Sequence, residues 1–411
     1  MTEKRGSFRA WTQLLAIFAF SLSLLGTFLV RSGVLTSVHS FAADPKRGVF
    51  ILCFLAIVIG GSLLLYALRA PKVAGGEPFA AVSRETLLLV NNLMFTVAAA
   101  MVLLGTLYPM IGDAFDLGRI SIGPPYFGFM FVLLMVPVVL LMPFGPFIRW
   151  RAGDWRVAVA GLRPAFLGAV ACAIVAAIVA RTLGDGLPPR AIVGVAASLW
   201  VGLGIVLYAL SRWRHAPRGR RYTPEMLGMI CAHFGVAVFL TGVLTVEATS
   251  VEKDVRLAPN QTVTIGALDF RFDGVKEAKG PNFTAQQGSL SVLKDGAVVA
   301  SLHPQKRVYV RNQQPQTESA IDPGLFRDVY VALGEAVGDD GAWSVRVYVK
   351  PFVRWIWLGA LFMMLGGFIA ACDRRFRALP ARADERTAAT QATPSPPGPP
   401  FEGNGLDGTP A

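Results

Sequence analysis

The sequence predicts a polytopic α-helical membrane protein with about eight transmembrane helices and a small antiparallel β domain inserted between spans seven and eight. Composition carries the first half of this prediction: hydrophobic residues make up 53% of the 411 residues and charged residues only 16%. Soluble domains are about one-quarter charged, so a soluble globular protein is excluded. The second half depends on one long polar segment, residues 248–350, in which apolar and polar residues alternate.

Eight apolar runs are long enough to cross the roughly 30 Å hydrocarbon layer of a bilayer. The first run follows Thr2-Glu3-Lys4-Arg5-Gly6 without a small-residue cleavage site, so we do not interpret it as a removable signal peptide. We interpret the four cysteines as small core residues, because all lie in or beside these runs and none forms a CxxC pair. The predicted spans are residues 10–30, 49–68, 87–111, 126–148, 158–180, 191–211, 226–246 and 352–372.

Basic residues at the ends of the runs predict the orientation of the bundle, because cytoplasmic loops carry an excess of Lys and Arg. With the N-terminus inside, the cytoplasmic loops and ends carry nineteen Lys and Arg residues, whereas the short loops on the outer side carry six. Both termini are therefore expected in the cytoplasm of a bacterial cell. The same rule explains the net charge of +12 and the cluster Arg218-Gly219-Arg220-Arg221, so we expect no nucleic-acid binding.

The chain divides into four predicted parts. Residues 1–247 form a bundle of seven spans. Residues 248–350 form the β domain, since alternation such as Trp343-Ser344-Val345-Arg346-Val347 and the turn pairs Asp295-Gly296 and Asp340-Gly341 are typical of antiparallel strands. By the predicted topology this domain is periplasmic. Residues 351–375 form the last transmembrane helix, and residues 376–411, rich in Ala, Thr and Pro, are expected to be a disordered cytoplasmic tail.

His233 lies in the middle of the seventh span, and an ionisable residue at membrane depth indicates function by default. A neutral imidazole is a good iron ligand, and histidines on facing helices commonly hold transmembrane haem. The structural alternative is a hydrogen bond to a neighbouring helix. Its small neighbours would let either a flat cofactor or another helix approach; they are Gly228, Ala232, Gly235 and Ala237.

His39 lies in an outer loop, residues 31–45, that is unusually apolar for an aqueous connection. We expect this loop to lie against the membrane surface as a short helix. Leu35, Val38 and Phe41 would then form apolar walls near the imidazole, which suits the edge of a haem and equally suits an interfacial anchor. The pattern alone leaves both interpretations open. Arg31 stands at the outer end of the first span.

Other polar features are interpreted as structural. We expect His215, in a basic loop, and His303, between two β segments, to be solvated. Arg84-Glu85 is interpreted as an ion pair at a helix start, and Asn91-Asn92 as interhelical hydrogen-bond donors. The sequence contains no P-loop, GxSxG or HExxH motif, so a nucleotide- or zinc-driven enzyme has no support.

Several long motifs resemble those of the CcmF family of cytochrome c-type biogenesis proteins, and the resemblance extends from about residue 2 to 375. The first motif is the run from Gly26 through Arg31-Ser32-Gly33 and Val38-His39-Ser40-Phe41 to Asp44-Pro45-Lys46-Arg47-Gly48. The others are Ser83-Arg84-Glu85 with Asn91-Asn92, Gly105-Thr106-Leu107-Tyr108-Pro109, Ile120-Ser121-Ile122-Gly123-Pro124-Pro125-Tyr126-Phe127, Ala232-His233-Phe234-Gly235-Val236-Ala237, Val329-Tyr330-Val331-Ala332-Leu333-Gly334-Glu335 and Lys350-Pro351-Phe352-Val353-Arg354-Trp355.

The resemblance implies a haem lyase subunit in the bacterial inner membrane. Such a protein attaches haem to the CxxCH motif of apocytochrome c at the periplasmic face, by adding two cysteine thiols across two haem vinyl groups. Expected partners are haem, apocytochrome c, and the haem chaperone and apocytochrome-handling subunits of the maturation system. By resemblance, His39 is an axial ligand of the haem being attached, His233 ligates a structural haem b, and Arg31 belongs to the cofactor site.

The sequence also departs from the family pattern. The tryptophan-rich WWD loop is absent, and each bis-histidine haem site is only half present. The chain therefore resembles the C-terminal two-thirds of the family. We expect either a fragment, through a miscalled start or a frameshift, or one chain of a naturally split protein. The alternative functions are a non-catalytic scaffold subunit of a split haem lyase and a truncated inactive fragment, and we expect the chain alone not to attach haem.

Overall fold

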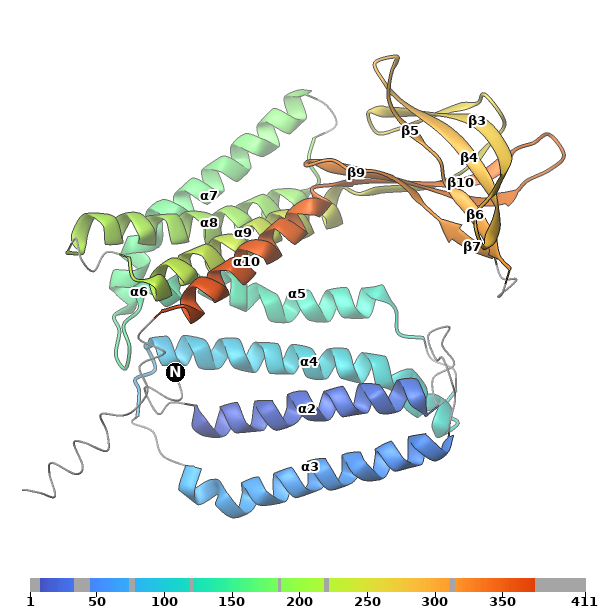
Figure 1. The fold of residues 1–411 in the computed structure, drawn as a ribbon. Coiled ribbons are helices and arrows are strands. Elements are labelled where there is room, and N and C mark those ends of the chain that lie inside the picture. The colour runs from blue at the N-terminus through green and yellow to red at the C-terminus, as the bar shows by residue number, and fades with distance from the viewer. Residues whose placement is uncertain are drawn as a thin grey trace, which may run out of the picture.

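The fold is known from a computed structural model, which describes residues 8–32, 45–73, 78–118, 121–183, 186–217, 222–310 and 315–373. Within these residues, eight helices are long and apolar enough to cross a membrane. A β domain lies between the seventh and eighth of them (Figure 1). The predicted fold class is therefore confirmed.

The helices form two groups of neighbours. α7, α8, α9 and α10 lie together, and α4 and α5, which contact each other, reach this group through α6 and α8; α2 and α3 form the other group (Figure 1). Ser83 and Thr223 cap α4 and α9, because each hydroxyl accepts a hydrogen bond from the backbone N–H three residues later. The helices are α2 Arg9–Arg31, α3 Pro45–Val73, α4 Arg84–Ala114, α5 Pro124–Leu141, the short α6 Phe144–Phe147, α7 Trp155–Leu183, α8 Pro189–His215, α9 Pro224–Thr249 and α10 Val353–Ala371.

Glycines bring α9 and α10 into close contact. A Cβ atom added at Gly235 would lie 2.7 Å from the backbone nitrogen of Met363 and 2.8 Å from the carbonyl oxygen of Gly359, which is closer than real Cβ atoms approach. Gly228 and Ala232 meet α10 in the same way, at Gly366. Of the two interpretations of the small residues around His233, the structure therefore supports packing against another helix for these three.

The β domain is built from two antiparallel sheets. The four-stranded sheet has the order β1-β10-β9-β8, and the six-stranded sheet has the order β2-β3-β4-β6-β7, with β5 also paired to β4 (Figure 1). β1 follows α9 directly and β10 leads directly into α10. The strands are β1 Val251–Leu257, β2 Thr262–Ile265, β3 Leu268–Lys279, β4 Phe283–Lys294, β5 Ala297–Leu302, β6 Gln305–Tyr309, β7 Pro315–Glu318, β8 Ala320–Asp322, β9 Arg327–Ala336 and β10 Trp343–Pro351.

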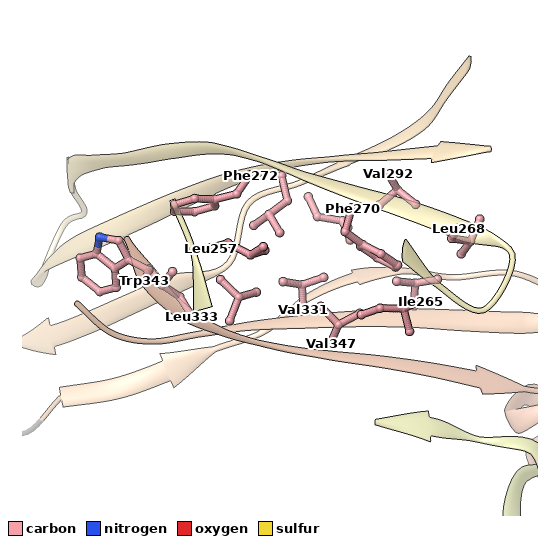
Figure 2. Packing of buried hydrophobic residues seen from close by; sticks show 14 residues of the cluster. Leu257, Ile265, Leu268, Phe270, Phe272, Val292, Val331, Leu333, Trp343 and Val347 are labelled. Carbon is pink, nitrogen blue, oxygen red and sulfur yellow. The ribbon is translucent and has the colours of Figure 1, made fainter. Parts of the chain in front are cut away.

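Alternate residues of both sheets form the core between them (Figure 2). Phe270 and Phe272 of β3 are fully buried, as are Val331 of β9 and Val347 of β10. This period-two burial is the pattern on which the β prediction rested. The pair Asp295-Gly296 has positive φ at both residues, as a two-residue hairpin turn requires, and it joins β4 to β5.

The interpretation of the cysteines as core residues is wrong for three of the four. Cys53, Cys172 and Cys372 are exposed, and only Cys231 is half-buried, with its Sγ–H donating to the carbonyl oxygen of Phe362 at 3.3 Å. The sequence misled because the outer faces of membrane helices are as apolar as the interior. All four are free thiols.

Candidate functional site

A hydrogen bond to the backbone fixes the tautomer of His233. Its Nδ1 lies 2.9 Å from the carbonyl oxygen of Met229, one turn earlier in α9. A carbonyl oxygen only accepts hydrogen bonds, so Nδ1 must carry the proton and donate it. In the neutral imidazole, Nε2 then holds a free lone pair. This is the tautomer in which a histidine ligates a metal, with its other ring nitrogen fixed by a backbone carbonyl.

The imidazole lies on a different face of α9 from the residues that pack against α10. His233 precedes Val236 by three residues and Leu240 by seven, so the three side chains share one helix face. Val236 and Leu240 pack against a buried cluster whose members are Leu162, Ala165, Ala169, Trp200, Val201 and Ala237. Thus one face of α9 packs against α10, and the half-buried imidazole of His233 lies on a different face of α9.

The other predicted site residues are not brought to His233. His39 lies outside the described residues. Arg31 is exposed in the last turn of α2, which belongs to the other helix group (Figure 1). His215 is exposed at the end of α8, with Nδ1 3.0 Å from the carbonyl oxygen of Ser211. His303 is exposed beside strand β5, with Nδ1 3.4 Å from the Ser289 hydroxyl.

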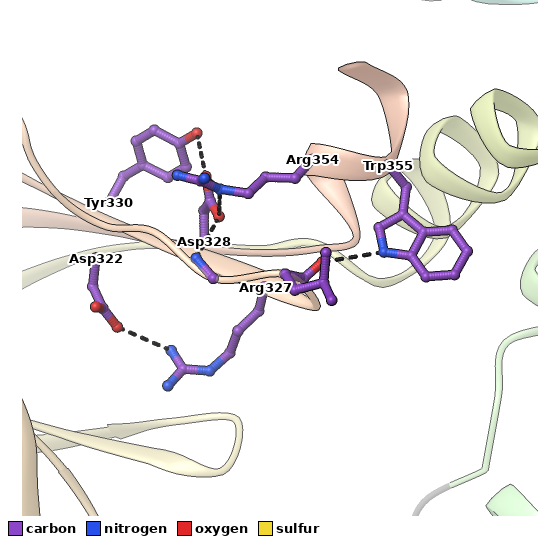
Figure 3. A network of polar contacts seen from close by, with 8 residues as sticks. Asp322, Arg327, Asp328, Tyr330, Arg354 and Trp355 are labelled. Carbon is purple, nitrogen blue, oxygen red and sulfur yellow. Dashed lines mark hydrogen bonds and ion pairs between the residues drawn. The ribbon is translucent and has the colours of Figure 1, made fainter. Parts of the chain in front are cut away.

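A polar network joins the β domain to α10, and the sequence did not predict it (Figure 3). The carboxylate of Asp328, in β9, is buried and accepts hydrogen bonds from Arg354 Nε at 3.0 Å and from the backbone N–H of Gly324 at 3.0 Å. The Tyr330 hydroxyl donates to the same carboxylate at 3.4 Å. Burial and the nearby negative charge of Asp328 raise the pKa of Tyr330, which therefore remains a neutral hydrogen-bond donor.

Arg84 and Glu85 fix the opposite end of the bundle. Arg84 donates to the carbonyl oxygens of Pro146 at 2.9 Å and Ile148 at 3.0 Å. The Glu85 carboxylate accepts the backbone N–H of Arg151 at 2.8 Å. Both side chains thus tie the start of α4 to α6 and to the segment that follows it. The motif that we interpreted as a local ion pair therefore makes long-range contacts to backbone groups.

A cavity of about 660 Å³ lies between α5, α7 and α8. Its lining is apolar apart from Arg163, and it includes Trp155 and Trp200. None of its lining residues is a His, Cys, Met or Tyr, the side chains that ligate haem iron, so the cavity is not itself a haem-ligating site. Arg163 lies two turns inside α7, and our charge count, which considered only the run ends, missed it.

Comparison with known proteins identifies relatives along nearly the whole chain. Residues 248–351 match the family model described as the CcmF C-terminal beta-sandwich. The chain is 50% identical over 381 residues to the cytochrome c-type biogenesis protein CcmF of Pseudomonas aeruginosa, and the match covers 92% of this chain and 57% of the relative. Identity to CcmF of Escherichia coli is 45% over 377 residues, with the same coverage of both chains.

A solved structure described as cytochrome c haem lyase CcmF has the same fold. It superposes with a TM-score of 0.69 over 89% of this chain and 55% of that chain, at 21% sequence identity. The chain thus spans little more than half the length of the relatives that it matches. Identity of 45–50% over 92% of the chain places it in the CcmF family, as a sequence that corresponds to part of a CcmF protein.

Proposed function

We propose that the chain acts in cytochrome c maturation, as part of the haem lyase that attaches haem to CxxCH motifs of apocytochrome c. The observation that carries the proposal is the 50% identity to a CcmF protein over 92% of the chain. In this reaction each cysteine S–H adds across a haem vinyl group: sulfur bonds to one carbon and hydrogen to the other. No external oxidant or reductant is consumed in the addition itself.

His233 is proposed as an axial ligand of a resident haem b. The Nδ1–H bond to Met229 supports this role, because it leaves Nε2 as the ligating atom and limits rotation of the ring. The shared face with Val236 and Leu240, which contact the buried cluster, would keep water from the imidazole. When bound, the haem would pass electrons from an external reductant to the iron of the substrate haem, which keeps that iron ferrous.

The remaining roles follow the sequence expectations. His39 would ligate the haem that is being attached, and Arg31 would supply a cation for the carboxylates of a haem. Haem, apocytochrome c, and the haem chaperone and apocytochrome-handling subunits of the maturation system are the proposed partners. The chain would lie in the bacterial inner membrane with both termini in the cytoplasm and the β domain in the periplasm.

The test compares His233→Ala with His215→Ala in a strain that lacks its own CcmF. The chain is expressed together with the remaining length of a CcmF relative, and covalent haem on a c-type cytochrome is measured. We expect His215→Ala to match the parent, because that side chain is exposed at a helix end. In His233→Ala, covalent haem on the c-type cytochrome should be lost, and the purified membrane protein should lose its b-type haem spectrum. An unchanged spectrum and yield in His233→Ala would overturn the assignment.

A further inference from the structure

The loop between β8 and β9, residues 323–326, contacts the first turn of α10 and exposes two large apolar side chains. Leu325 and Phe326 are each 59% exposed. On a water-facing surface this pair would be an unfavourable apolar patch. The surroundings of the loop indicate what covers it.

Backbone and ring contacts fix the loop to α10. The indole Nε1–H of Trp355 donates to the carbonyl oxygen of Leu325 at 3.1 Å, and the backbone N–H of Phe352 donates to that of Phe326 at 2.8 Å. The ring centroid of Phe326 lies 5.7 Å from that of Phe352 and 6.4 Å from that of Trp355. The loop therefore stays at the level of the first turn of α10.

The length of α10 sets that level relative to the membrane. The helix has 19 residues, which at about 1.5 Å per residue span roughly 28 Å, barely the thickness of the hydrocarbon layer. No turn is left to extend into water, so the first turn of α10 must lie at the boundary between acyl chains and headgroups. Residues that contact this turn lie at the same boundary.

The neighbouring side chains have the chemistry of that boundary. Tryptophan and tyrosine are enriched there, and Arg and Lys keep their apolar stems in lipid while their charges reach the headgroups. Here the half-exposed Arg354 sits beside Trp355. The Lys350 ammonium lies over the rings of Tyr330 and Tyr348, 5.6 and 5.0 Å from their centroids.

We propose that Leu325 and Phe326 insert into the headgroup boundary of the bilayer and attach the β domain to the lipid surface. The domain is otherwise joined to the membrane helices through two chain connections, α9 to β1 and β10 to α10, whose strands pair with each other, and through the contact of Asp328 with Arg354. All of these attachments are to protein. An attachment of residues 323–326 to lipid adds a direct contact with the bilayer and restricts tilting of the domain over the bundle.

The experiment places a nitroxide spin label at three matched positions of the full chain, in nanodiscs of phosphatidylethanolamine and phosphatidylglycerol. The native cysteines are first replaced by serine. Leu325→Cys is compared with Leu361→Cys, 55% exposed within α10, and with Val298→Cys, 55% exposed on β5. Collisions with dissolved oxygen, which concentrates in lipid, and with a water-soluble nickel chelate report the depth of each label.

At Leu325 the label should collide with nickel several-fold less often than at Val298, and with oxygen more often, as at Leu361. Collision rates equal to those at Val298 would show that the loop lies in water and would overturn the proposal. Protection from both reagents would also overturn it, because protein, and not lipid, would then cover the loop. Phe326→Cys, 59% exposed, provides a second label if Leu325→Cys does not fold.

Discussion

Asp328 shows how one buried carboxylate can hold two parts of this molecule together. Its side chain is 6% exposed, and a charge at that burial is tolerated only when it is paired and hydrogen-bonded. Its donors come from the loop before β9, from β9 itself and from α10: Gly324, Tyr330 and Arg354. The sequence showed only an Asp in a strand and an Arg at the start of a span, so the bond between them could not be read from local pattern.

Replacing Asp328 tests this attachment. Asp328→Asn keeps the shape but removes the charge that faces Arg354, and it should lower the free energy of unfolding by roughly 2 kcal/mol. The measurement is denaturant unfolding of the detergent-solubilised chain, followed by near-ultraviolet circular dichroism. Asp254→Asn is the control, because the ion pair of Asp254 with Arg346 is exposed and should contribute far less. Equal losses in both variants would contradict the special role of Asp328.

Two exposed aspartates of the β domain should make its stability depend on acidity. Hydrogen bonds from Arg346 and Arg256 lower the pKa values of Asp254 and Asp340, respectively. A carboxyl group with a lower pKa in the folded state stabilises that state above its unfolded pKa, about 4, and loses this contribution as pH falls through the folded value. The unfolding free energy of the parent should therefore decrease more steeply below pH 4 than that of Asp254→Asn/Asp340→Asn. Parallel curves would show that these pairs contribute nothing.

At the scale of elements, the packing of α9 against α10 determines which face of α9 is covered and which face carries His233. Glycines recur at intervals of seven on both helices, at 228, 235 and 242 in α9 and at 359 and 366 in α10. Seven residues are nearly two turns, so these glycines form one face on each helix. The sequence displayed these small residues, but it did not show whether a helix or a cofactor covered them. That answer required α10, more than a hundred residues away in the chain.

Two adjacent glycines of α10 provide a matched test. A Cβ at Gly366 would lie 2.6 Å from the backbone nitrogen of Ala232, whereas at Gly367 nothing lies within 4 Å. Gly366→Ala should destabilise the chain by about 1–3 kcal/mol through overpacking, while Gly367→Ala should be neutral or slightly stabilising. Thermal unfolding in detergent measures both. If the two variants melt together, α9 and α10 do not pack through these glycines.

The elements that the sequence predicted best are those whose signal is local. Each of the eight apolar runs became a helix, because length and apolarity alone decide whether a segment can span a bilayer. The period-two alternation likewise indicated the β domain. Strand order could not be predicted: β4 pairs with β5 through one half and with β6 through the other, an arrangement set by turns and core packing. For the candidate site, sequence singled out His233, whereas its bond to Met229 and its helix face became visible only in the structure.

At the scale of the whole molecule, α9 and α10 are the two helices that connect the β domain to the membrane bundle. β1 continues from α9, β10 leads into α10, and the two strands pair from Val251 with Val349 to Leu257 with Trp343. Any tilt of the β domain must therefore act on the helix that carries His233. The side of the membrane on which the β domain lies depends on the orientation of the helices, and the loop charges predict that orientation.

The last prediction concerns this orientation. The loops and ends on one side carry nineteen Lys and Arg residues and the short loops on the other side carry six, so the β domain should lie on the side with fewer, the periplasm. Val298→Cys, exposed on β5, should react with a membrane-impermeant maleimide in intact cells, once the native cysteines are replaced. A cysteine at Trp213, exposed in the last turn of α8, should react only after the inner membrane is opened. The reverse pattern would place the β domain in the cytoplasm. The predicted topology puts His39 on the same side as the β domain, so this result would also contradict the role proposed for His39.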